Sequence, residues 1–171
     1  MLRPIPAPLL PVALLAAGCS AAGPGCPGQP VATLQFQAAL AGSSCGGAPS
    51  AAYANQLPAS FAFSATLAYA AQGSAAALCT GRVDSSPLVG TRSGDAISVL
   101  VDTSQAALAG CSSTCAVSVE QLVTGTLSRD AAGTPTGFTG TLVETDTAAP
   151  GADCAPCTSP CQATWTLAAT P

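Results

Sequence analysis

The sequence contains no histidine and no lysine, and these two absences remove several kinds of chemistry. Without histidine the chain cannot build a Ser-His-Asp or Cys-His catalytic site or a His-ligated metal centre. Without lysine it cannot form a Schiff base. Its four arginines stand against eight acidic residues and form no basic stripe that could neutralise phosphates. We therefore predict no nucleic-acid partner and no activity that depends on histidine or lysine.

Large apolar side chains are scarce as well. Hydrophobic residues make up 49% of the 171 residues, but much of that share is alanine, with four Phe, two Tyr and one Trp. The length allows one domain with short extra segments. Because so few large side chains can fill the core, we expect covalent cross-links to supplement hydrophobic burial.

The apolar run near the N-terminus is too short for a transmembrane helix. A positive start at Arg3 is followed by the apolar stretch Leu9–Ala17 and by small residues up to Gly18. This is the layout of a secretory signal peptide. Prolines at positions 4, 6, 8 and 11 would also interrupt a membrane helix. We predict that residues 1–18 are a signal peptide that is removed on export.

The segment Leu15–Cys19, with the sequence LAAGC, resembles the lipobox of bacterial lipoproteins. In that family the cysteine thiol receives a diacylglycerol, the preceding peptide is removed, and the new amine is acylated, commonly with palmitate. The resemblance implies that Cys19 is the lipidated first residue of the mature chain and that this anchor makes a membrane its partner. Ala16 departs from the usual pattern, in which leucine is commonest at that place. The resemblance covers only about the first twenty residues.

Two outcomes for the N-terminal segment stay open. Ser20, where some lipoproteins carry an acidic retention residue, resembles lipoproteins that are released to the outer membrane. An ordinary signal peptide cut after Ala22 would instead yield a secreted or periplasmic soluble protein. In either case residues 19–30, rich in glycine and proline, are expected to form a tether ahead of a single β-domain over residues 31–171.

Nine cysteines are an odd number for a disulfide framework, and lipidation of Cys19 would leave an even set. An exported protein folds in an oxidising compartment, where cysteines form disulfides. Each of four bridges would contribute about 2–4 kcal/mol of stability. The sequence does not choose among the pairings of the remaining cysteines, which are Cys26, Cys45, Cys79, Cys111, Cys115, Cys154, Cys157 and Cys161.

The spacing of some cysteines also suits other chemistry. Cys111-x-x-x-Cys115 and Cys154-x-x-Cys157-x-x-x-Cys161 resemble zinc-site spacings, and Cys154-Ala-Pro-Cys157 resembles a thioredoxin-type redox pair. A redox pair of that kind needs its first cysteine at a helix N-terminus, whereas a β-type strand follows Cys157. We expect structural disulfides here, with no metal and no cofactor.

The chain is predicted to be all-β because apolar residues recur at every second position. The pattern is clearest over Phe61–Tyr69, Ile97–Val101 and Ala163–Leu167, and Val31–Ala38 is expected to be the first strand. Consecutive hairpins imply an antiparallel meander of about seven or eight strands. Such a meander removes its edges by closing as a small barrel or by packing as a sandwich, here braced by disulfides.

Three hairpins follow from register, because paired residues must point to the same face. In the last hairpin Gly125 would lie opposite Gly140, and such facing glycines would let a twisted sheet coil or would leave room for a ligand to approach the backbone. The turns are expected at Gln72-Gly73-Ser74, Ser93-Gly94 and Asp130–Gly133. The predicted pairs are Leu67 with Cys79, Phe63 with Val83, Leu88 with Val99, Gly90 with Ile97, Leu127 with Phe138, Val123 with Leu142 and Gly125 with Gly140.

Paired carboxylates are the remaining route to acid–base catalysis. Asp102, Glu120, Glu144 and Asp146 lie on predicted strands or strand ends, where solvated acids on the outer face are the ordinary outcome. Glu144 is the exception, because it shares a face with Leu142. We expect it to mark the place where the buried part of its strand ends.

These observations favour a non-enzymatic lipoprotein of the cell envelope whose β-domain has a structural or interaction role, with an envelope protein as its partner. A second hypothesis is a carrier that holds a small apolar ligand in a lipocalin-like barrel, although the comparison is architectural and no lipocalin motif is present. A cavity lined by Phe61, Phe63, Val99 and Trp165 would favour the carrier. The third hypothesis, a carboxylate-based hydrolase, needs two of the acids in one cleft.

Overall fold

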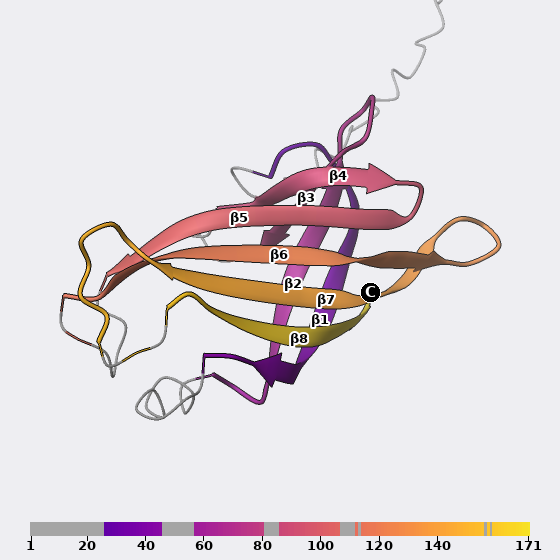
Figure 1. The fold of residues 1–171 in the computed structure, drawn as a ribbon. Helices are drawn as coiled ribbons and strands as arrows, with labels where there is room; N and C mark the ends of the chain where they lie inside the picture. The colour runs from indigo at the N-terminus through magenta and orange to yellow at the C-terminus, as the bar shows by residue number, and fades with distance from the viewer. Residues whose placement is uncertain are drawn as a thin grey trace, which may run out of the picture.

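Apolar side chains at alternate positions produce eight β-strands in the computed structural model, which describes residues 26–45, 57–80, 86–106, 112, 114–155, 157 and 159–171. The strands are β1 (Gln29–Ser43), β2 (Ser60–Tyr69), β3 (Ala75–Thr80), β4 (Leu88–Ser93), β5 (Ala96–Ala106), β6 (Ala116–Arg129), β7 (Pro135–Ala148) and β8 (Cys161–Thr170). Consecutive strands pair antiparallel, and β1 pairs with β8, which closes the sheet into a barrel (Figure 1).

The barrel confirms the predicted antiparallel meander and selects closure over a sandwich. Each described strand bonds to two neighbours, so the unpaired edges of an open sheet are removed. The first strand was expected over Val31–Ala38 and in the structure extends from Gln29 to Ser43. The strands β5, β6 and β7 are also long, and they continue past their neighbours at one end of the barrel (Figure 1).

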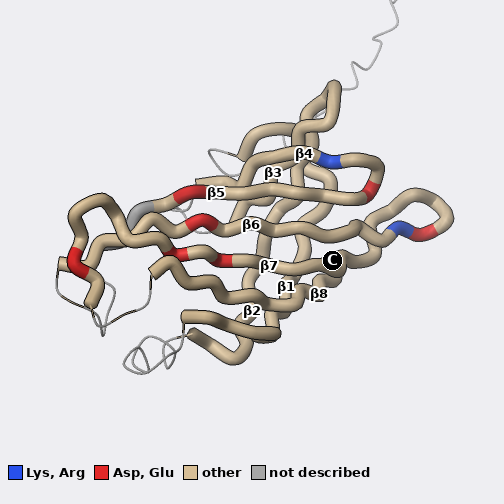
Figure 2. Tube along the Cα trace, viewed as in Figure 1, with Lys and Arg blue, Asp and Glu red and all other residues tan. Residues whose placement is uncertain are grey.

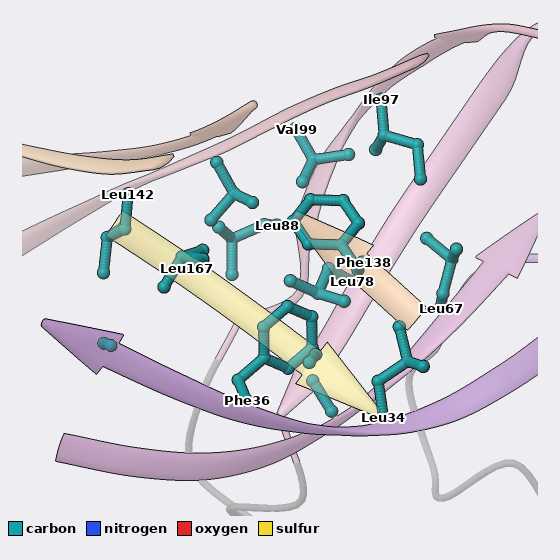
Figure 3. Close-up of a cluster of buried hydrophobic side chains, with 14 of the residues drawn as sticks. Leu34, Phe36, Leu67, Leu78, Leu88, Ile97, Val99, Phe138, Leu142 and Leu167 are labelled. Carbon is teal, nitrogen blue, oxygen red and sulfur yellow. The ribbon is translucent and has the colours of Figure 1, made fainter. Parts of the chain in front are cut away.

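The barrel interior is filled by side chains that come from all eight strands. On β8 every second residue from Cys161 to Ala169 is buried, which is the period expected of a strand with one face inward. Phe36 of β1 contacts Phe138 of β7 edge to face, with ring centroids 5.5 Å apart. Figure 3 shows both rings among converging aliphatic side chains. An eight-stranded barrel is just wide enough for such a packed core.

The hairpin of β6 and β7 has the register that the sequence predicts. Leu127 lies opposite Phe138, Val123 opposite Leu142 and Gly125 opposite Gly140. The loop is closed by the carboxylate of Asp130, whose Oδ1 accepts hydrogen bonds from the backbone N–H groups of residues 132 and 134. Such side-chain acceptance is the reason that aspartate favours turns.

The predicted register of β4 and β5 is wrong by two residues. The two turn residues are Gly94 and Asp95, so Gly90 pairs with Val99 rather than with Ile97. Gly94 has a φ of +60°, which a two-residue hairpin turn of the type I′ or II′ class requires at its first position. Because the error is an even number of residues, Ile97 and Val99 still face the core. Leu88, which was expected opposite Val99, instead pairs with Leu78 of β3.

The predicted register of β2 and β3 is wrong by one residue, which reverses a face. Leu67 pairs with Leu78, and Cys79 pairs with Thr66 and faces outward. The strand begins with three alanines, which are too small to specify which face is buried, so the larger Leu78 decides. Val83, the expected partner of Phe63, lies outside the described residues.

The facing glycines on β6 and β7 allow the two backbones and a ring to approach closely. A Cβ atom on Gly125 would lie only 2.8 Å from Cε1 of Phe138, and one on Gly140 only 2.7 Å from the Cα of Gly125. The space over this pair is occupied by the Phe138 ring. The contacts support the interpretation that the glycines serve sheet packing rather than access for a ligand.

Candidate functional site

The predicted lipidation site, Cys19, lies outside the described residues, as do the signal peptide and Cys111. Three disulfides join described cysteines, namely Cys26–Cys79, Cys45–Cys161 and Cys115–Cys154. Cys157 is disulfide-bonded as well. These bonds confirm the expectation of structural bridges. Among the described residues, none belongs to a helix long and apolar enough to cross a membrane.

The pairings contradict a redox role for Cys154-x-x-Cys157. Cys154 is bonded to Cys115, and its sulfur is therefore not paired with that of Cys157. The bridge ties the segment after β7 onto β6, where Cys115, Val117 and Cys154 form a small buried cluster. A disulfide sulfur is not a thiolate, so these atoms cannot serve zinc in this oxidised state.

The bridge between Cys26 and Cys79 attaches the start of the described chain to the outer face of β3. The chain bends at Gly28, where φ is +104°, before it enters β1. A Cβ atom on Gly28 would lie 2.8 Å from the carbonyl carbon of Tyr69, so only glycine fits this approach without a shift. The last residues of the predicted tether are therefore fixed to the barrel.

Charged residues gather at the two ends of the barrel, and both ends carry acids (Figure 2). Acidic residues gather where β5 and β7 end and β6 begins, and in the loop after β7. We call this the acidic end. Both described arginines lie at the opposite end, at the turns between β4 and β5 and between β6 and β7. The residues at the acidic end are Asp102, Glu120, Glu144, Asp146 and Asp153.

The opposite end carries Asp95 and Asp130 beside its two arginines. Arg129 Nε donates a 2.7 Å hydrogen bond to Asp95 Oδ1 in a pair that remains partly exposed. The guanidinium of Arg92 lies 4.5 Å from the centre of the Tyr69 ring, where a cation is attracted to the ring face. Burial raises the pKa of the Tyr69 hydroxyl, so this group stays neutral at physiological pH.

Two carboxylates of the acidic end face each other on the outside of the barrel. Asp102 of β5 is directly opposite Glu120 of β6, and both are exposed, as the sequence predicts for outer-face acids. Like charges directly opposite each other destabilise a sheet. The described arginines are at the other end and do not compensate this pair.

The inner face of the same end carries Glu144 and Asp146. Glu144 is half-buried, and its Oε2 accepts a 2.7 Å hydrogen bond from Nε2 of Gln121. Its inward direction confirms the register argument. The expectation that the buried region ends at Glu144 is wrong, because Asp146 two residues later is only 3% exposed.

Asp146 is the least ordinary acid in the barrel. It lies between Val119 of β6 and Cys161 of β8, and no described residue donates a hydrogen bond to its buried Oδ1. Burial raises the pKa of its carboxyl above the ordinary value. The prediction that Asp146 is a solvated outer acid is therefore wrong, although its spacing of four residues from Leu142 contained the signal for an inward side chain.

Asp146 is also close to a disulfide. One of its oxygens and the Sγ atoms of Cys45 and Cys161 lie within 4.8 Å of one another, which is a distance suited to metal ligands. The two sulfurs are bonded to each other, however, so neither can act as a thiolate ligand while the bridge is intact. The group is therefore a buried carboxyl beside a disulfide.

The four acids considered for hydrolysis lie as two pairs on opposite faces of the sheet. Asp102 and Glu120 are on the outer face of the sheet, whereas Glu144 and Asp146 are on the inner face. The sheet itself therefore separates the two pairs. A general acid and a general base need to flank one substrate bond from within the same cleft.

The residues expected to line a carrier cavity are packed against one another and against the core. Phe63 stacks on Phe36 with ring centroids 4.7 Å apart, and Phe61 meets Trp165 edge to face at 5.7 Å. The indole N–H of Trp165 donates to the backbone carbonyl of residue 58. Val99 is 1% exposed. This part of the interior is occupied by protein side chains.

Comparison with protein-family models, with curated proteins and with solved structures finds no significant match to this chain. Function must therefore be inferred from the chain's own residues and geometry.

Proposed function

We propose that this protein is a non-enzymatic lipoprotein of the cell envelope, anchored in the outer membrane through Cys19, whose barrel has a structural or interaction role. The observation that carries the proposal is the set of disulfides that brace the barrel. Disulfides persist in oxidising compartments outside the cytoplasm. They support the export that the N-terminal signal predicts.

The start of the barrel suits a short anchor. Cys26 is held on β3 by its bridge to Cys79, and Cys19 precedes it by seven residues. Seven extended residues span at most about 25 Å. A lipid on Cys19 would therefore keep the barrel close to the membrane surface, and several acyl chains would hold it more firmly than one.

The interior supports a structural or interaction role over the two alternatives. Packed rings of Phe36, Phe63 and Trp165 occupy the space that a carrier would need for an apolar ligand. Of the acids that a hydrolase would need, Asp102 and Glu120 lie on the exposed outer face of the sheet, and Glu144 is hydrogen-bonded to Gln121. The surface of the barrel is then the part that can recognise a partner.

The decisive experiment is mass spectrometry of the mature N-terminus after expression of the full chain in a bacterium that processes lipoproteins. We expect a first residue of Cys19 that carries a diacylglycerol and an N-acyl chain. The protein should fractionate with outer membranes. A matched Cys19→Ser variant should lose both the lipid and the membrane fraction.

An unlipidated N-terminus after Ala22, with the protein in the soluble fraction, would contradict the proposed anchor. It would favour the secreted or periplasmic alternative. Thiol titration of the native protein gives an independent check, since the cysteines of the three described bridges should not react without a reductant.

A further inference from the structure

An apolar row crosses the outer face of the barrel where polar residues would be ordinary. Val89 of β4 pairs with Leu100 of β5, Leu100 with Leu122 of β6, and Leu122 with Val143 of β7. We call these four residues the apolar stripe. Val89 is 48% exposed and Leu100 is 41% exposed, and they are the large hydrophobic residues most open to solvent in the described chain.

The two borders of the stripe differ. On one side, two residues along each strand, lie hydroxyl side chains, including Thr91, Ser98 and Thr124. On the other side lies the facing pair Asp102 and Glu120. The stripe is therefore apolar along its length, uncharged on one flank and doubly negative on the other.

The closed barrel limits how a partner can bind there. At the stripe each strand is already paired on both sides, so an added strand has no edge to join there. A partner must instead lie on the face of the sheet. The stripe crosses the strands, and neighbouring strands are about 4.8 Å apart, so its four positions extend over about 14 Å along the convex outer face of the barrel.

An α-helix laid across the strands has a similar spacing of apolar residues, and it packs most closely on the central residues Leu100 and Leu122 because the face is convex. Its apolar residues at i, i+4, i+7 and i+11 extend over about 16 Å, because a helix rises about 1.5 Å per residue. The difference of about 2 Å is within the reach of flexible side chains. Basic residues along one flank of such a helix would neutralise the carboxylates of Asp102 and Glu120, which repel each other when nothing is bound.

We propose that the apolar stripe binds a cationic amphipathic helix of a partner protein, which lies across β4–β7 with its basic flank against Asp102 and Glu120. The identification of the partner as an envelope protein rests on the proposed function. The inference that this surface binds a cationic helix does not. A bilayer is the less favoured occupant, because a lipid surface that is anionic would be repelled by the same two carboxylates.

The test uses the mature chain secreted behind a conventional signal peptide, with Cys19 replaced by serine, so that the result does not depend on lipidation. The probe is a synthetic amphipathic helix with four leucines on one face and arginines along one flank. We expect binding by isothermal titration calorimetry. Amide chemical shifts should change on β4–β7 and not on β1 or β2.

Variants locate the binding energy. Leu100→Thr should weaken binding about tenfold, because a buried leucine contact is lost at an exposed site that suits threonine. The double variant Asp102→Asn with Glu120→Gln should weaken binding about fivefold and reduce its dependence on salt. Asp153→Asn is the matched control, since it removes one exposed charge from the same end away from the stripe, and it should leave binding unchanged.

Three results would overturn the proposal. One is equal binding of a probe in which glutamates replace the arginines. Another is binding that Leu100→Thr leaves unchanged. The third is binding of the protein to vesicles of phosphatidylethanolamine and phosphatidylglycerol that Leu100→Thr abolishes, which would assign the stripe to lipid. None of these results bears on the lipid anchor, which is tested separately by the mass of the native N-terminus.

Discussion

A methyl group added at Gly125 should destabilise the barrel more than its small size suggests. The new Cβ would lie 2.8 Å from Cε1 of Phe138 and would also overlap the backbone carbonyl oxygen of residue 139. Ordinary contacts between carbon atoms are about 3.5–4.0 Å, so the ring must move by about 1 Å. Phe138 is buried and contacts Phe36, so the shift disturbs the centre of the core.

We expect Gly125→Ala to reduce the free energy of unfolding by about 3 kcal/mol, the upper part of the usual range for overpacked cores. We expect a loss in the upper part of that range because the new methyl group also contacts a backbone oxygen, and a backbone atom cannot move away by changing a rotamer. For a domain of this size, that loss corresponds to a fall in Tm of roughly 6–12 °C. Denaturant unfolding with the disulfides oxidised gives the free energy directly.

Gly42→Ala on β1 is the matched control. A Cβ atom at Gly42 meets no described atom within 4 Å, so this variant should be neutral or stabilised by up to about 1 kcal/mol. Equal stability of Gly125→Ala and Gly42→Ala would refute the argument. It would mean that the Phe138 ring and the neighbouring backbone can move away from the new methyl group at no cost.

Three further predictions concern single groups. Asp146→Asn should flatten the pH dependence of stability, because burial raises the pKa of Asp146 in the folded state above its ordinary value of 3.8, and its ionisation therefore destabilises the wild type as the pH rises above that value. Unfolding at a series of pH values measures this, and parallel curves for the two proteins would contradict it. Replacing Cys45 and Cys161 together by alanine should cost about 4 kcal/mol, because their bridge closes a segment with a sequence separation of 116, and unchanged denaturant midpoints would count against it. Arg129→Gln should cost less than about 1 kcal/mol, since its pair with Asp95 is partly exposed, and the cost should vanish in high salt; a larger loss that salt does not reduce would contradict this.

The sequence specified the β6–β7 hairpin well because several signals agree there. Large apolar residues face each other at Leu127 and Phe138, and Asp130 and Gly133 suit the loop. Agreement between local and long-range preferences is what makes a register predictable. The closed meander followed from such hairpins, whereas the choice between barrel and sandwich depended on whether the first and last strands meet.

The register errors occur where the local sequence favours neither of two alternative pairings. Between β4 and β5, a glycine can occupy either turn position, and the error of two residues left the inward set of side chains intact. Between β2 and β3, a run of alanines left Leu78 and Cys79 as competing inward residues. The larger Leu78 takes the inner face, and Cys79 bonds to the distant Cys26 on the outer face. Disulfide pairings depend on such contacts between remote segments, which sequence spacing does not contain.

The acidic end was partly predictable. The inward direction of Glu144 followed from register, and the same period applied to Asp146 would have placed it inside. The apolar stripe was also encoded, since Leu100 and Leu122 have the outward parity of their strands. Outward leucines are common singly, so only the register of four strands reveals that they form a continuous row.

The bridge from Cys26 to Cys79 determines how the barrel would bear mechanical load. A pull on the chain ahead of Cys26 does not reach β1 first, because the covalent bond transmits the force to β3, which is flanked by β2 and β4. Peeling β1 from its N-terminal end would break hydrogen bonds one after another. The bridge prevents this because it holds the chain that enters β1 against β3, so the barrel should resist traction from its N-terminal side better than its small core implies.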